Sequence, residues 1–281
     1  MKKIIFIEGL PGSGKTTMAK KLSDYLHDTG EKSVFYREGD LHPVDLAWIA
    51  ILSKEELDHL VNRYPTLKDA ILNNIKQFKD KYHLAYTQVK INQETKDFFD
   101  YCLKYEIYQA EDYNHFLQKH LVLWEEFLKE KRQDDFIYVF ECIFLQNHIN
   151  ELLLKYDMTL EAINEYFSRF QEILKSIDVQ LIYIKQNDVD DTLKRITEER
   201  RTNDKTLYED WIDHVIEYFE GSRYGKSKGY IGYDGALRYF KNRQDIELKV
   251  VDNLEFDTHV IPLDKDYGLV FSEIVKSISL N

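Results

Sequence analysis

Short apolar runs alternate with longer amphipathic segments along this chain. Residues 3–7, 136–140 and 179–184 are runs of strand length that are rich in β-branched and aromatic side chains. Because few polar residues interrupt them, these runs predict strands that are buried on both faces. Two further strands are predicted at residues 33–37 and 247–251.

Amphipathic helices separate the predicted strands. Apolar side chains recur at spacings of three and four residues, which is the period of one helix face. Helices are predicted at residues 14–29, 113–128 and 160–177, after the capping residue Asp188, and from about residue 267 onward. Strands that alternate with helices predict right-handed crossovers and a parallel sheet, so the expected fold class is α/β.

One long segment interrupts this alternation. Residues 42–132 predict helices with no convincing strand. We therefore expect a core formed by residues 1–41 and 133–281, and a helical insertion of residues 42–132 that caps a small ligand. The segment 221–235 contains several glycines and predicts a loop.

Composition and charge exclude several classes of protein. The 281 residues are 43% hydrophobic and 31% charged, which rules out a mainly disordered chain. Fifty acidic side chains against 38 basic ones give a formal charge of −12, a sign that does not favour a nucleic-acid polymer as partner. With two cysteines, neither a disulfide scaffold nor a cysteine zinc site is expected. No apolar run approaches the ~18 residues that cross a bilayer, so we expect a cytoplasmic protein without a membrane anchor.

One short motif carries most of the chemical information. Residues 9–16 read Gly-Leu-Pro-Gly-Ser-Gly-Lys-Thr, which fits the phosphate-loop consensus Gly-x-x-x-x-Gly-Lys-Ser/Thr between a predicted strand and a predicted helix. In such a loop the backbone N–H groups surround a phosphate, Lys15 reaches the outer phosphates, and the Thr16 hydroxyl binds Mg²⁺. The predicted nucleotide-binding residues are Gly9, Pro11, Gly12, Ser13, Gly14, Lys15, Thr16 and Thr17. The alternative is a glycine-rich turn that opens a helix without binding a ligand.

With this motif and this order of elements, the chain resembles the P-loop kinases, a branch of the P-loop NTPases. The resemblance covers most of the chain outside the insertion. It implies a three-layer α/β sandwich around five parallel strands, with the third strand beside the first and an arginine-bearing lid helix after the fourth. It also implies ATP and Mg²⁺ as cofactors and a small molecule as phosphoryl acceptor.

Glu141 is a second candidate for binding the metal. It ends the apolar run 136–140, and burying a carboxylate there is costly unless a cation or hydrogen-bond donors satisfy it. The carboxyl ends of parallel strands form the ligand crevice of an open sheet, so Glu141 is expected near the glycine loop. We assign it to Mg²⁺, directly or through water; the alternative is a strand-end glutamate bonded to backbone N–H groups. Cys142 stands where the related kinases usually carry an arginine.

Glu38 and Asp40 are candidates for a general base. They follow the second predicted strand, where the related kinases often place a carboxylate that accepts the proton of the attacking hydroxyl. Asp40 is slightly preferred over Glu38. Alternatively, either side chain caps the turn that follows.

The arginines after the fourth predicted strand resemble those of a kinase lid. Arg195 and Arg200 are expected to cover the phosphates and to neutralise charge in the transition state. Arg201 lies beside them, and three such residues on one helix cannot all point the same way. The alternative is a solvated helix face on which the arginines pair with Glu198 and Glu199.

Three functions fit these residues; the third is phosphoryl transfer to a nucleic-acid 5′ end, which the acidic balance disfavours, or to a protein. The first is an ATP- and Mg²⁺-dependent phosphotransferase that moves the γ-phosphoryl group to a small hydroxyl- or phosphate-bearing acceptor, such as a nucleoside, a nucleotide or another small molecule. The second is a nucleotide-dependent switch whose helical insertion binds a protein partner. Stimulation of ATP consumption by a small acceptor separates the first two, because a switch needs no acceptor. The identity of the acceptor, the choice between ATP and GTP, and the oligomeric state stay open at this point.

Overall fold

The computed structural model describes residues 1–206 and 208–278. The chain divides into two compact units: Met1–Arg37 together with the residues from Glu130 onward form the first, and Glu38–Lys129 form the second. Within the described ranges, no helix is both long enough and apolar enough to cross a membrane.

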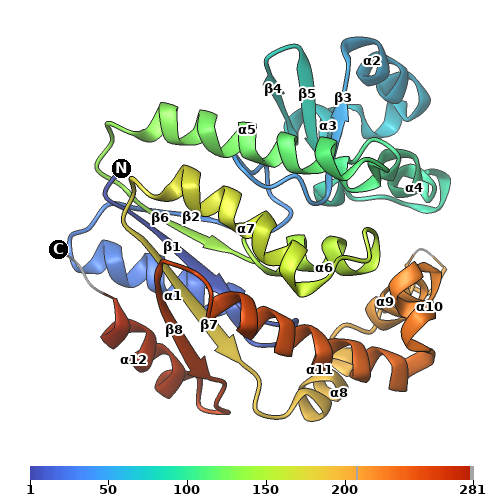
Figure 1. Ribbon diagram of the computed structural model, residues 1–281. Helices are drawn as coiled ribbons and strands as arrows, with labels where there is room; N and C mark the ends of the chain where they lie inside the picture. Colours follow the sequence, from blue (N-terminus) through green and yellow to red (C-terminus); the bar gives the residue numbers. More distant parts are fainter. Residues whose placement is uncertain (207, 279–281) are drawn as a thin grey trace. The chain divides into compact units, whose positions relative to one another are not determined.

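The first unit is built around a five-stranded parallel sheet (Figure 1). Its strands are β1 Lys3–Glu8, β2 Ser33–Tyr36, β6 Ile137–Glu141, β7 Val179–Lys185 and β8 Asp257–Pro262, and they lie in the order β2-β6-β1-β7-β8. The predicted parallel sheet is confirmed, and so is the position of its third strand, β6, beside the first. Because β1 lies in the centre, every one of its residues is buried, and this explains its mainly apolar sequence.

Helices cover both faces of this sheet (Figure 1). On one face, α1 Lys15–Asp28 and α12 Tyr267–Ser277 share an apolar cluster with the strands. On the other face, the ring of Phe144 stacks on Phe6 at 4.7 Å between centroids and contacts Phe167. The remaining helices of the unit are α6 Gln146–Leu154, α7 Leu160–Leu174, α8 Val189–Glu199, α9 Trp211–Gly221, α10 Arg223–Lys228 and α11 Gly232–Val251.

Two segments of the first unit differ from the sequence prediction. Residues 247–251, predicted as the last strand, form the end of α11, where buried positions continue at helical spacing to Val251. The last strand is instead β8, an edge strand whose polar sequence Asp-Thr-His-Val-Ile-Pro gives a weak strand signal. Residues 221–235, predicted as a loop, contain α10 and the start of α11. Gly225 is required by close packing in α10, because a Cβ there would lie 1.9 Å from the carbonyl oxygen of Phe219.

The second unit has a small antiparallel sheet of its own. Its strands β3 Ile49–Leu52, β5 Lys81–Ala85 and β4 Ile75–Phe78 pair in that order, so the prediction of an insertion without strands is wrong. The β4–β5 hairpin turns at Lys79, where φ is 54°, and lacks the Asn-Gly or Asp-Gly pair that marks such turns in a sequence. The helices are α2 Lys54–Arg63, α3 Lys68–Asn73, α4 Phe98–Leu103 and most of α5 Tyr113–Lys131, with short 3-10 helices at Pro65–Leu67, Tyr86–Gln88, Gln93–Thr95 and Ile107–Gln109.

An ion pair lies in the interior of the first unit, between α11 and β7. Arg243 Nε donates to Glu247 Oε1 at 2.7 Å, and Tyr183 Oη donates to Glu247 Oε2 at 2.6 Å. The side chain of Arg243 is 3% exposed and that of Glu247 is 0% exposed. Burial of these charges is tolerated because each has a partner of opposite sign within one turn of the same helix.

A buried carboxyl on α6 makes the stability of the first unit depend on pH. Burial raises the pKa of Glu151 to about 7, although Tyr218 and Asn150 donate hydrogen bonds to it. The ordinary pKa of 4.5 applies to the unfolded chain, so the native protein binds more protons between these two values. Stability therefore falls as the pH rises through this window.

The substitution Glu151→Gln removes this titration and keeps an acceptor oxygen for Tyr218 and Asn150. We expect the variant to gain up to about 3 kcal/mol of stability relative to the wild type between about pH 5 and pH 8. Urea denaturation of both proteins at the two pH values measures this gain. A difference in unfolding free energy that is the same at both pH values would contradict the prediction.

Candidate phosphate-binding loop

The predicted phosphate loop joins β1 to α1 at the carboxyl end of the central strand. Three of its glycines have positive φ angles, 139° at Gly9, 84° at Gly12 and 82° at Gly14. Such angles strain any residue with a Cβ. Space is short as well, since a Cβ on Gly9 would lie 2.5 Å from the carbonyl oxygen of Ile184. Glycine is thus required at these positions by the backbone angles of the loop and, at Gly9, by lack of space.

Thr16 and Glu141 meet at this edge of the sheet. Glu141 is the last residue of β6 and pairs with Ile7 of β1, two residues before the loop begins. Thr16 Oγ1 lies 3.0 and 2.9 Å from the two carboxylate oxygens of Glu141 and donates a hydrogen bond to them. Glu141 is buried. A hydroxyl and a carboxylate side by side are hard oxygen ligands of the kind that Mg²⁺ prefers, so these residues fit the predicted metal.

Lys15 lies over the loop that it is predicted to serve. Its Nζ donates to the carbonyl oxygen of Leu10 at 2.9 Å, and the side chain is buried. The ammonium group carries three donors, so the bond to Leu10 leaves two of them for other oxygens. The position is compatible with the predicted contact to an outer phosphate.

Glu8 lies directly before the loop and is not among the residues that the sequence analysis selected. It ends β1, is fully buried, and accepts hydrogen bonds from the backbone N–H groups of Phe144 at 2.7 Å and Gln146 at 3.1 Å. Burial raises the pKa of Glu8 to about 8, while these backbone bonds and the charge of Lys15 oppose the rise. The signal used for Glu141, an acidic residue that ends an apolar strand, applies equally to Glu8 and could have found it.

Cys142 turns the chain directly after the candidate metal ligand. Its φ is 69°, its backbone N–H donates to the carbonyl oxygen of Ile7 at 3.3 Å, and its Sγ donates to Glu141 Oε2 at 3.4 Å. A buried thiol supplies no positive charge. This position therefore lacks the positive charge that the related kinases usually carry here.

The candidate lid arginines have different surroundings. Arg195 of α8 donates from one terminal nitrogen to the carbonyl oxygen of Gly12 at 2.7 Å and pairs with Glu199. Arg200 follows the end of α8, and its guanidinium lies 4.9 Å from the ring centroid of Trp211. Of these two arginines, Arg195 is the one that contacts the loop. Its role toward phosphates stays a prediction.

Arg201, the third arginine of this segment, pairs with Glu198 at 2.6 Å. Both side chains are more than half exposed. This is the solvated arrangement that the sequence analysis kept as the alternative for any one of the three arginines.

Glu38 and Asp40 belong to the second unit, at its first residues. Glu38 Oε1 accepts a hydrogen bond from Trp48 Nε1 at 3.3 Å, whereas the side chain of Asp40 is exposed. The role of either residue as a general base stays a prediction. The described contacts within the second unit do not favour one carboxylate over the other as the base.

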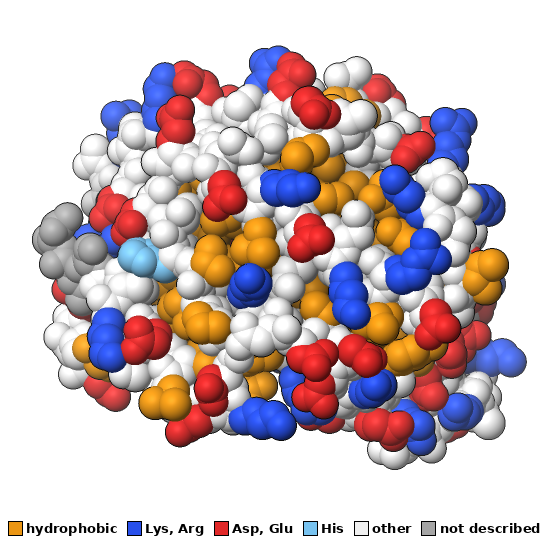
Figure 2. All heavy atoms as spheres, turned by 60° about the horizontal axis from the view of Figure 1, so that its bottom comes forward, with side chains coloured by type: hydrophobic (Ala, Val, Ile, Leu, Met, Phe, Trp, Pro, Cys, Tyr) orange, Lys and Arg blue, Asp and Glu red, His pale blue; other side chains and the backbone are white. Residues whose placement is uncertain are grey.

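The surface view in Figure 2 bears on the expected class of partner. On the face that it shows, basic side chains are interspersed with acidic and apolar ones. Such mixing agrees with the excess of acidic residues in the sequence. This face does not offer the uniform positive field that attracts a polyanion.

The structure therefore brings Glu141 and Arg195, which lie far from the loop in the sequence, into contact with loop residues Thr16 and Gly12. No protein-family model matches this sequence. No curated protein matches it either. The case for a function consequently rests on the residues and geometry of the chain itself.

Proposed function

We propose that the protein is an ATP- and Mg²⁺-dependent phosphotransferase of the P-loop kinase kind, which transfers the γ-phosphoryl group to a small hydroxyl- or phosphate-bearing acceptor. The observation that carries the proposal is the contact of Thr16 Oγ1 with Glu141, at 3.0 and 2.9 Å, beside a loop of positive-φ glycines. A loop residue and a strand-end carboxylate thus offer oxygen ligands at one point, next to backbone donors for a phosphate.

Each residue of the loop has a physical role in this proposal. The backbone N–H groups of Gly12 and Gly14 are suited to hold phosphate oxygens, supported by the amino end of α1. Lys15 leaves the carbonyl oxygen of Leu10 and binds an outer phosphate. Thr16 and Glu141 would hold Mg²⁺, directly or through water, and the ion would neutralise charge that develops on the phosphoryl oxygens.

Phosphoryl transfer needs little covalent help from a protein, so positioning and charge stabilisation supply most of the rate. Arg195 is the arginine proposed to add charge, and of the two candidate arginines it is the one that contacts the loop, at the carbonyl oxygen of Gly12. The acceptor hydroxyl requires a base or a solvent path for its proton, and Asp40 or Glu38 is the proposed base.

The test is ATP consumption with Mg²⁺ against a panel of nucleosides, nucleotides, sugars and other hydroxylated small molecules. We expect one acceptor class to stimulate consumption, and Lys15→Ala to lower the stimulated rate at least about 100-fold without unfolding the protein. Lys20→Ala is the matched control, because Lys20 lies on the same helix with its side chain 71% exposed. A fully active Lys15→Ala protein would overturn the proposal. Nucleotide binding that no acceptor stimulates would favour a nucleotide-dependent switch instead.

A further inference from the structure

In a phosphate loop, some backbone carbonyl oxygens need hydrogen-bond donors that the residues of the motif do not supply. When backbone N–H groups point inward at a phosphate, the carbonyl oxygens of the same peptides point outward, because a trans peptide holds its C=O and N–H in opposite directions. Outward carbonyl oxygens that are buried need hydrogen-bond donors. Two of them have side-chain donors from outside the motif: Gln186 for Pro11 and Arg195 for Gly12.

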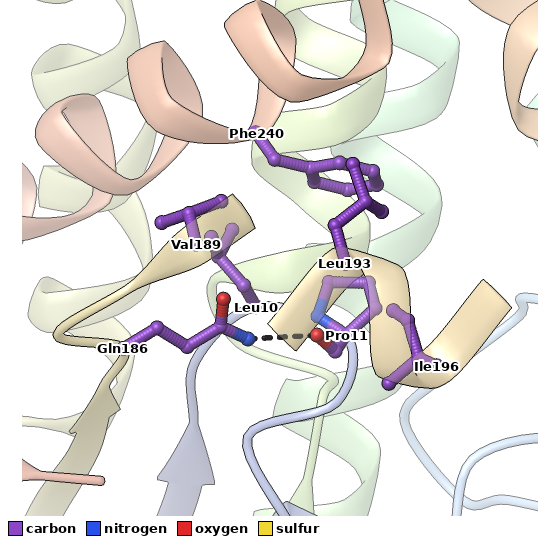
Figure 3. A pocket seen from close by; sticks show the side chains of 7 residues that line it. All are labelled: Leu10, Pro11, Gln186, Val189, Leu193, Ile196 and Phe240. Carbon is purple, nitrogen blue, oxygen red and sulfur yellow. Dashed lines mark hydrogen bonds between the residues drawn. The ribbon is translucent and has the colours of Figure 1, made fainter. Parts of the chain in front are cut away.

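Gln186 is the donor with the more enclosed position. It follows the last residue of β7, is 2% exposed, and donates from Nε2 to the carbonyl oxygen of Pro11 at 2.8 Å. Figure 3 shows its side chain pointing at Pro11 between apolar residues of the loop and of α8. These apolar neighbours include Leu10, Val189 and Leu193. In such surroundings few water molecules can replace Pro11 as the partner of the amide. The bond to Pro11 therefore fixes the peptide group between Pro11 and Gly12, which includes the Gly12 N–H.

Gln244 of α11 fixes Gln186 in turn. Its Oε1 accepts from the backbone N–H of Gln186 at 2.9 Å, and its Nε2 donates to the carbonyl oxygen of Gln186 at 3.1 Å. Both bonds are buried, and together they close a ring through one amide group, which accepts and donates at once. The backbone of Gln186 is thereby held in register with α11.

We infer that Gln186 and Gln244 are positioning residues for the nucleotide: Gln244 holds the main chain of Gln186, and Gln186 holds the Pro11 peptide so that the Gly12 N–H faces the phosphate. The inference rests on the proposed function, because it requires a nucleotide phosphate in the loop. Gln186 also precedes the first residue of α8 by three positions. The residue that holds the loop therefore lies directly before the helix that carries the candidate lid arginine Arg195.

The test is titration of a fluorescent ATP analogue with Mg²⁺ into the wild type, Gln186→Leu and Gln244→Leu. Leucine keeps the volume and removes the hydrogen bonds. We expect each variant to bind the analogue about 10-fold more weakly, as loss of one well-placed hydrogen bond would cause. The double variant should bind no more weakly than Gln186→Leu alone, because Gln244 acts through Gln186.

Gln180→Leu is the matched control for a merely structural effect. Gln180 is a buried amide on β7, the strand that Gln186 follows, and its Nε2 donates to Asp257 at 2.8 Å and to the carbonyl oxygen of Ser277 at 2.7 Å. The control should lose stability in urea like the other variants but bind the analogue like the wild type. Binding by Gln186→Leu and Gln244→Leu that equals the control overturns this inference. A wild type that does not bind the analogue overturns the proposed function itself. If Gln186→Leu does not fold, Gln244→Leu decides the question, because it removes the bonds to the main chain of Gln186 without changing the Gln186 side chain.

Discussion

Replacement of Glu247 by alanine is expected to lower the free energy of unfolding by about 3–5 kcal/mol. The loss arises because Arg243 would keep its charge in the interior without the carboxylate that it contacts at 2.7 Å. Tyr183 would also lose the acceptor of its hydroxyl. The charge cannot reach solvent without moving α11, because Arg243 is only 3% exposed.

Urea denaturation of the Glu247→Ala protein measures the loss, and two further variants identify its cause. The double variant Arg243→Met with Glu247→Leu should recover most of the stability, because apolar side chains of similar volume carry no charge to desolvate. Glu165→Ala removes an exposed partner of Arg169 at the same spacing of four residues and should change little. A Glu247→Ala protein as stable as the wild type would show that Arg243 finds another partner or solvent.

Gly9→Ala is expected to destabilise the first unit by about 3 kcal/mol and to abolish nucleotide binding. Two costs add at this position. The φ of 139° belongs to a region that residues with a Cβ rarely adopt. The new Cβ would also lie 2.5 Å from the carbonyl oxygen of Ile184, and because this oxygen belongs to the backbone of β7, the loop must move away from its strand.

Gly30→Ala separates these two costs. Gly30 has a φ of 90°, but a Cβ there would meet no atom within 4 Å. We expect this control to show backbone strain alone, about 1 kcal/mol, with unchanged nucleotide binding. Thermal or urea unfolding, together with the fluorescent titration, gives both readouts. Equal losses in the two alanine variants would mean that close approach to β7 is not what requires glycine in the loop.

The parts of the fold that could be predicted from the sequence are those in which the residues of one short segment are enough to indicate its structure. The apolar run at residues 136–140 predicts β6, because a strand that is buried on both faces has apolar residues at every position and not at alternate ones. Glu141 stands out because it breaks that run, and the structure places it against Thr16. The signal for the glycine loop is equally local, because the positive φ angles occur at glycines of the motif itself.

The failures arise where the deciding contact is distant or where the local signal is ambiguous. The apolar residues within 247–251 are compatible with a strand or with a buried helix. The segment is helical because its buried positions continue the helical spacing of α11. The β4–β5 hairpin uses Lys79 where a turn signal would have shown asparagine or aspartate before glycine. Gln186 and Gln244 are ordinary glutamines in the sequence, and their importance depends on partners that only the folded chain brings near.

The central place of β1 also has a consequence for protein synthesis. Its Lys3 pairs with Ile137 and its Ile4 with Val179, so both neighbouring strands are translated long after it. At ribosomal speeds of about 5–20 residues per second, the second partner emerges roughly 10–35 s later. Until β6 emerges the strand exposes apolar side chains and two unpaired edges, and one edge stays unpaired until β7 emerges. Both features promote aggregation. We therefore expect chaperones that bind nascent chains to determine how much of this protein a cell recovers in soluble form.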